Sequence, residues 1–160
     1  MQAGLEGRIH IVLNLANQTV QLETGRPLAA IQQLLVGKTV EQVLERIPLL
    51  FSICSHAQSL AALQACQTAS GLAVNPKLHS AQQQLVNLET QREHVLRVLM
   101  DWSVWLGQAP NPTLVQQAMR IVPQARASWF KKGEAFSLDS ELTNAVMDRL
   151  DVWDIFLETH

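Results

Sequence analysis

The sequence of 160 residues lacks the features that mark several common classes of protein. Lysine and arginine are not clustered and the net charge is −2, so nothing in the chain is typical of a nucleic-acid-binding surface. No apolar run approaches the roughly 18 residues of a membrane span. Residues 1–7 show no basic segment followed by an apolar core, so no signal peptide is expected. We therefore expect a soluble, cytoplasmic protein.

The chain also lacks the motifs of common enzymes. It has no Ser-His-Asp set, no phosphate-binding loop and no His-Glu-x-x-His pattern. Those motifs supply a nucleophile, a cradle for phosphate groups and a set of metal ligands. An independent hydrolase or nucleotide-binding enzyme is therefore not expected.

Cysteine is scarce, because only Cys54 and Cys66 are present and both fall in one predicted helix. At a helical rise of about 1.5 Å per residue they would lie roughly 18 Å apart, which excludes a mutual disulfide. Cys54 lies near the predicted start of the helix, where unpaired N–H groups and the helix dipole favour a thiolate. Cys66 lies about 120° around the helix from Cys54 and is expected in the core.

What the sequence does contain is a series of helical patterns preceded by a short hairpin. Alternating apolar residues over 8–15 and a second extended run over 19–23 predict two strands. A lone hairpin is marginal in water, so we expect it to lie on the helices that follow. The length and the 48% hydrophobic content predict a single domain, with the hairpin at 1–26 and a helical bundle at 27–160. The predicted fold class is thus mainly α with an N-terminal β-hairpin.

Capping and breaking residues predict where the helices begin and end. Thr39 and Gln42 form a capping-box pattern, and Pro48 should close or bend the helix that it starts. Ser52 is the predicted cap of the next helix, and Pro123 is expected to kink or break a later one. The predicted helices cover 27–36, 40–48, 53–70, 76–106, 113–131 and 137–157.

Residues from 7 to about 107 resemble the N-terminal half of the nickel–iron hydrogenase large-subunit family. That family carries a Cys-Gly-x-Cys-x-x-x-His motif that leads into a helix. Here residues 51–58 read Phe-Ser-Ile-Cys-Ser-His-Ala-Gln, and Cys54 matches the second cysteine.

Two later features of the family also have counterparts in this chain. Gly71 and Pro76 match a glycine–proline corner, and the long helix that follows matches one with a Glu…His pattern. In that helix the matching positions are held by Glu89, Glu93 and His94. The resemblance implies that Glu89 and His94 approach the helix of the cysteine motif.

The departures from the family bear directly on activity. Phe51 stands in place of the first cysteine, Ser52 in place of the glycine and Gln58 in place of the histidine. No cysteine follows Cys66, whereas the family completes its metal site with a second cysteine pair near the C-terminus. Phenylalanine cannot ligate a metal and glutamine is a poor substitute for histidine. A four-thiolate nickel–iron site therefore cannot form from this chain alone, and hydrogenase catalysis is not expected.

Within the family, the chain looks most like the HupK/HoxV type, which is associated with hydrogenase maturation. The resemblance implies a non-catalytic scaffold or chaperone for an Fe(CN)₂CO cofactor fragment or for large-subunit assembly. The implied partners are the hydrogenase large subunit or maturation chaperones, and the implied cargo is transient iron with CO and cyanide ligands.

The candidate site residues follow from that resemblance and from helix geometry. Cys54 is the candidate ligand for the iron fragment, although a small buried residue is the alternative reading. Gln58, four residues on, would lie on the same face and could hydrogen-bond a cyanide ligand. His94 is a further candidate near the metal, although a structural polar role for Glu93 and His94 is the alternative. His56 should point away from Cys54, as a surface residue or a partner contact.

Two other functions stay open. The chain could be a metal-free helical module that only docks a partner. It could also be one half of a split large-subunit-like protein, whose missing cysteines lie on a separate chain.

Overall fold

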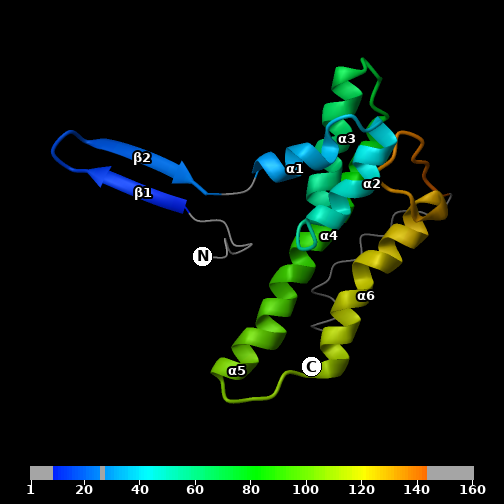
Figure 1. Cartoon of the computed structure of the whole chain (residues 1–160). Coiled ribbons are helices and arrows are strands. Elements are labelled where there is room, and N and C mark those ends of the chain that lie inside the picture. Colours follow the sequence, from blue (N-terminus) through cyan, green and yellow to red (C-terminus); the bar gives the residue numbers. More distant parts are fainter. Residues whose placement is uncertain (1–8, 26–27, 144–160) are drawn as a thin grey trace. The chain divides into compact units, whose positions relative to one another are not determined.

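The computed structural model describes residues 9–25 and 28–143 (Figure 1). The fold is mainly α with an N-terminal β-hairpin, which confirms the predicted fold class. The chain forms two compact units, residues 1–38 and 39–160, and the single domain stays a prediction. None of the helices within the described ranges is both long enough and apolar enough to cross a lipid bilayer.

The first unit contains the predicted hairpin. Strand β1 (Ile9–Asn14) pairs antiparallel with β2 (Thr19–Thr24), so that Ile9 lies opposite Thr24 and Asn14 opposite Thr19. Because side chains alternate between the two faces of a strand, one face gathers most of the apolar residues, Ile9, Ile11, Leu13, Val20 and Leu22. Whether this face lies on the helices stays a prediction. Helix α1 (Leu28–Leu35) follows the hairpin.

The second unit is built from helices whose starts are encoded locally. The Thr39 hydroxyl accepts the N–H of Gln42, and the Gln42 side chain accepts the N–H of Thr39, so the predicted capping box is confirmed. Asn75 and Asn111 cap α4 and α6 in the same way as each other, each before a proline in the first turn. The helical elements are α2 (Val40–Leu50), α3 (Ser55–Ala69), α4 (Pro76–Arg97), the π-helical η1 (Val98–Trp102), α5 (Ser103–Trp105), α6 (Pro112–Trp129) and the 3-10 turn η2 (Lys131–Gly133).

Several predicted boundaries are confirmed and others are wrong. The long predicted helix exists, because α4, η1 and α5 follow one another without a gap from 76 to 105. Neither proline ends its helix, because α6 runs through Pro123 and α2 continues past Pro48 to Leu50, so the alternatives of a break at Pro123 and a stop at Pro48 are wrong, while a kink at Pro123 and a bend at Pro48 stay predictions. The predicted helix over 137–157 is wrong at 137–143, which are not helical. Its remainder lies outside the described residues.

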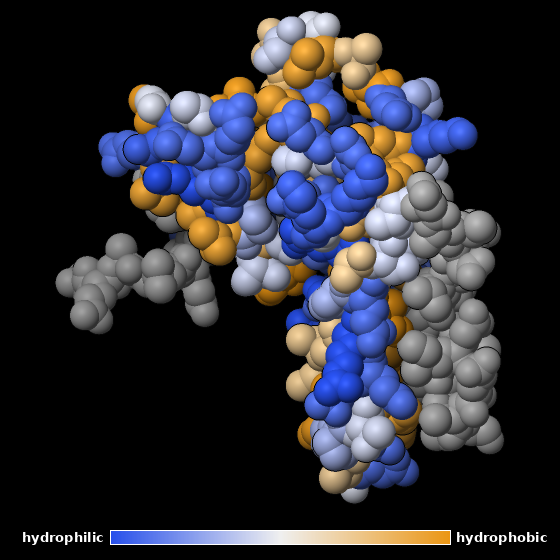
Figure 2. Space-filling model, turned by 90° about the vertical axis from the view of Figure 1, so that its right-hand side faces the viewer, coloured by the Kyte–Doolittle hydropathy of each residue, from blue (hydrophilic) through white to orange (hydrophobic). Residues whose placement is uncertain are grey.

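The core of the second unit lies between α4 and α6, which run side by side in Figure 1. Alanine at 81, 118 and 125 lets the two helices approach, while Leu85 and Val122 are fully buried between them. The segment after α6 closes this core, since Phe130 is 0% exposed and pairs with Leu142 in an isolated bridge. In Figure 2 the lower part of the visible face is largely hydrophilic, and hydrophobic patches lie between hydrophilic side chains in the upper part.

Candidate functional site

The start of α3 is held by a buried carboxylate from another helix. Glu89, on α4, is 3% exposed and accepts the backbone N–H of His56 at 3.0 Å and of Ala57 at 3.2 Å. These N–H groups belong to the first turn of α3, where no partner exists within the helix itself. Glu89 therefore caps α3 from a distance of 32 or 33 residues along the chain.

The side chains of the same turn bind the same carboxylate. Nδ1 of His56 lies 2.7 Å from Oε1 of Glu89, and the Ser55 hydroxyl donates to Oε1 at 3.1 Å. Because an ionised carboxylate only accepts hydrogen bonds, Nδ1 of His56 carries a proton. The His56 ring also meets the ring of Phe136 edge to face, with 5.6 Å between centroids.

The hydrogen bonds keep Glu89 ionised in spite of its burial. Burial disfavours the charged carboxylate and would raise its pKa. The hydrogen bonds from the His56 side chain and from the N–H groups of His56 and Ala57, with the charge of His56, outweigh this effect and lower the pKa of Glu89 to about 2. The cap is therefore a fixed negative charge at the positive end of α3.

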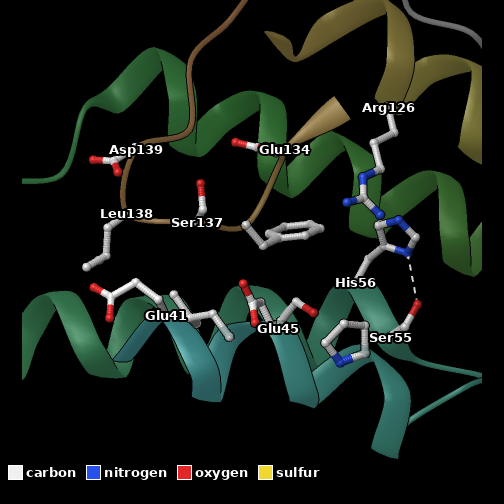
Figure 3. A pocket seen from close by; sticks show the side chains of 13 residues that line it. Glu41, Glu45, Ser55, His56, Arg126, Glu134, Ser137, Leu138 and Asp139 are labelled. Atoms are coloured by element: carbon white, nitrogen blue, oxygen red, sulfur yellow. Dashed lines mark hydrogen bonds between the residues drawn. The ribbon is translucent and has the colours of Figure 1, made fainter. Parts of the chain in front are cut away.

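His56 also lines a cleft of about 420 Å³ (Figure 3). One wall comes from α2 and carries Glu41 and Glu45, and the opposite wall is the segment 134–139 after α6. Arg126 of α6 and the first turn of α3 complete the lining. The cleft thus joins elements that are far apart in the sequence. Glu89 does not line the cleft itself, but it binds His56, which does.

Cys54 lies at the N-cap position of α3 and is exposed, which contradicts the alternative reading of a small buried residue. The predicted cap Ser52 is wrong, since α3 begins at Ser55. The N–H groups that were expected to favour a thiolate on Cys54 are accepted by Glu89 instead. Gln58 is exposed as well and donates its backbone N–H to the Cys54 carbonyl. Cargo binding by Cys54 and Gln58 stays a prediction.

The other predicted site residues have different surroundings. His56 is not a surface residue, since its side chain is 12% exposed, and its role in partner binding stays a prediction. Glu89 approaches the motif helix, as the resemblance implied, whereas His94 is exposed and makes no side-chain hydrogen bond to another described residue. Glu93 pairs with the adjacent Arg92 at 2.7 Å. Cys66 is partly buried, and neither cysteine is in a disulfide.

The cleft itself was missed from the sequence. Glu41 and Glu45 are four residues apart on α2, and this spacing could have indicated an acidic helix face. Arg126 and the segment 134–139 gave no such signal, because no local pattern shows which distant helix they face.

The first prediction concerns the Glu89 cap. Glu89→Ala leaves His56 and two N–H groups of α3 without their acceptor, so the free energy of unfolding should fall by about 3–5 kcal/mol. Glu89→Gln keeps one acceptor oxygen and should cost about 1–3 kcal/mol. Glu93→Gln, one turn along the same helix, is the matched control and should cost less than about 1 kcal/mol. Urea unfolding followed by circular dichroism measures all three, and equal losses for Glu89→Gln and Glu93→Gln would contradict the cap.

The second prediction is a pH dependence of stability. The pKa of Glu89 is about 2 in the folded chain, against an ordinary value of 4.5. Its contribution is therefore fully present above pH 4.5 and is lost as the pH falls toward 2, with a size on the order of 3 kcal/mol. The unfolding free energy of the wild type should fall through this window. Glu89→Gln should lack this part of the fall, and a parallel fall in both proteins would refute the assignment.

Comparison with known proteins gives two curated relatives. The hydrogenase expression/formation protein HupV of Azotobacter chroococcum mcd 1 is 39% identical over 152 residues, and HupK of Azotobacter vinelandii, with the same description, is 30% identical over 152 residues. Each match covers 93% of this chain and 44% of the relative, so the chain spans less than half of the length of either.

No protein-family model matches the chain. No solved structure matches it either. The two curated relatives nevertheless confirm, over 93% of the chain, the predicted resemblance to the HupK type of hydrogenase maturation protein.

Proposed function

We propose that this chain is a non-catalytic accessory protein in the maturation of a nickel–iron hydrogenase. The observation that carries the proposal is the similarity to HupV and HupK along 93% of the chain, since both relatives are described as hydrogenase expression/formation proteins. Because the chain spans 44% of those relatives, the proposal concerns the part of their function that this region supports.

The ligand set supports an accessory role rather than catalysis. Phe51 and Gln58 stand where the related large-subunit motif has a cysteine and a histidine. Within the described residues, no group of three or more histidine, cysteine, aspartate or glutamate side chains is placed to hold a metal ion. We infer that iron, where it is carried, is cargo held briefly and passed on.

Cys54 is the residue of this chain best suited to hold such cargo. It is exposed at the start of α3, and its thiolate would be a soft ligand that suits iron. Gln58 is exposed one turn later and offers an amide N–H₂ to a cyanide nitrogen. A single thiolate supplies one ligand only, which fits release to a partner better than permanent storage.

A metal-free docking module is the second candidate, and the α3 start favours it. The two N–H groups of that turn that would stabilise a thiolate or a bound anion already bind Glu89. The cleft beside this turn offers a surface that a partner could occupy without any metal. In this case the assembly partner, either the large subunit or a maturation chaperone, would bind whether or not Cys54 is present.

The third prediction tests the maturation role itself. Deleting the gene from its source organism should lower nickel–iron hydrogenase activity and the nickel content of the large subunit. Returning the wild-type gene should restore both, since the lost step is assembly and not expression of the structural genes. Unchanged large-subunit protein levels, measured by immunoblot, are the control for expression. Full hydrogenase activity in the deletion strain would overturn the proposal.

The fourth prediction separates the cargo carrier from the docking module. Protein purified without oxygen from cells that make the cofactor should contain substoichiometric iron and show infrared bands of CO and cyanide. Cys54→Ala should lose both signals, because the only proposed thiolate ligand is removed. Cys66→Ala is the matched control, since it removes the partly buried thiol of the same helix, and it should keep both signals. Wild-type protein without these bands would contradict the cargo carrier, and the docking module would then be the remaining candidate.

A further inference from the structure

The cleft beside His56 has an unbalanced distribution of charge. Four carboxylates line it, from Glu41 and Glu45 on α2 and from Glu134 and Asp139 on the opposite segment, against the single guanidinium of Arg126. None of the four forms a salt bridge with another described residue. Hydrogen bonds from its own N–H and from Thr39 lower the pKa of Glu41, so that carboxylate is charged at neutral pH.

The charges are arranged along the cleft rather than around one point. In Figure 3, Glu41 and Asp139 lie toward one end, while Arg126 and His56 lie toward the other. Within the described residues, no three carboxylate, histidine or cysteine side chains are grouped to bind a metal ion together. Four dispersed carboxylates suit a mobile cationic group on a longer ligand better than a bare ion.

The deeper lining is suited to the stem that carries such a group. Leu44, Pro48, Phe136 and Leu138 give the cleft an apolar surface between its carboxylates. Lysine side chains pack an aliphatic stem on apolar surface while the ammonium group stays among polar atoms. The cleft offers both the apolar surface and the carboxylates that such a side chain requires.

A hydroxyl on a buried residue of the cleft wall gives a second indication that a polar ligand fits here. Ser59 lines the cleft and is 3% exposed, yet its hydroxyl makes no hydrogen bond to another described residue. This hydroxyl is not among the buried side-chain atoms that lack a partner, so it is open to the cleft, where water or a ligand can bind it. The Ser59 oxygen could accept one hydrogen bond from an ammonium group in the cleft.

We propose that this cleft binds a lysine-bearing segment of a partner protein. The lysine stem lies along the apolar lining, and its ammonium group lies among the carboxylates of α2 and of the segment 134–139. Arg126, at the other end, donates its Nε–H to the carbonyl of Gly133, and its other guanidinium N–H groups could bind a carbonyl or a carboxylate of the partner segment. The proposal goes beyond the maturation role and does not depend on it, because it concerns the chemistry of the partner and not the process.

The test uses the full chain and a capped hexapeptide with two lysines, titrated by calorimetry and by NMR at about 50 mM salt, where surface charges are weakly screened. The matched peptide has norleucine at both positions, which keeps the stem and removes the charge. We expect the lysine peptide to bind, the norleucine peptide to bind at least about fivefold more weakly, and the difference to shrink as salt rises.

Substitutions on both walls test whether the lysine peptide binds in the cleft. Glu45→Gln combined with Asp139→Asn removes one carboxylate from each wall and should weaken the lysine peptide about fivefold. Glu23→Gln combined with Asp101→Asn is the control, because it removes two carboxylates outside the cleft, one exposed and one partly exposed and paired with Arg97, and its effect should stay within about twofold. Glu41→Gln with Glu134→Gln is a second cleft pair, and thermal melts check that each variant is folded.

The outcomes are distinct from those for the maturation role, since the peptide experiment requires no hydrogenase. Equal losses in the cleft and control variants would overturn the proposal, because the peptide would then respond only to overall charge. Equal affinity for the lysine and norleucine peptides, or no binding of either at about 1 mM, would overturn it as well. If the lysine peptide binds as expected but deletion of the gene leaves hydrogenase activity unchanged, the maturation role alone is refuted.

Discussion

The ionised Glu89 carboxylate is the constraint on which the arrangement of the second unit depends. It is nearly fully buried, so it must keep all of its hydrogen bonds, and those come from the backbone and side chains of one turn of α3. This requirement fixes the start of α3 against the middle of α4. It also fixes the His56 ring, whose other side meets Phe136 in the segment that closes the cleft. A single buried charge thus links two helices and one wall of the cleft.

The same interaction limits what the start of α3 can contribute to the chemistry of Cys54. A thiolate at the start of an isolated helix would gain from the free N–H groups and the helix dipole. In this chain a permanent negative charge already holds N–H groups of that first turn, so Cys54 gains less from its position than the sequence suggested. What remains is exposure, a thiol sulfur and the neighbouring Gln58. Those properties fit reversible contact with cargo or with a partner surface, and they do not build a closed metal site.

The difference between local and distant interactions explains how much could be predicted. The hairpin, the Thr39 capping box and the long helix over 76–105 were predictable because each depends on residues within a few positions of one another. The cap of α3 was not, because Ser52 offered a plausible local cap while the group used, Glu89, lies more than 30 residues away. The segment 137–143 resembled a helix start but is held by pairing with Phe130 and by packing under α6. The acidic cleft depends on the same distant packing, and only its α2 wall had a sequence signal.

The residues proposed for cargo binding and the residues that line the cleft lie together at the start of α3. Ser55 and His56 line the cleft, whereas Cys54, directly before them, and Gln58, two residues after His56, are exposed. Because Ser55 and His56 line the cleft directly after Cys54, a partner segment bound in the cleft would lie a few residues from the thiol. A partner could thus be positioned by charge at the cleft and receive cargo from Cys54 without a conformational change in α3. Docking and carriage are then not rival roles of the turn, since the first would bring the acceptor within reach of the second.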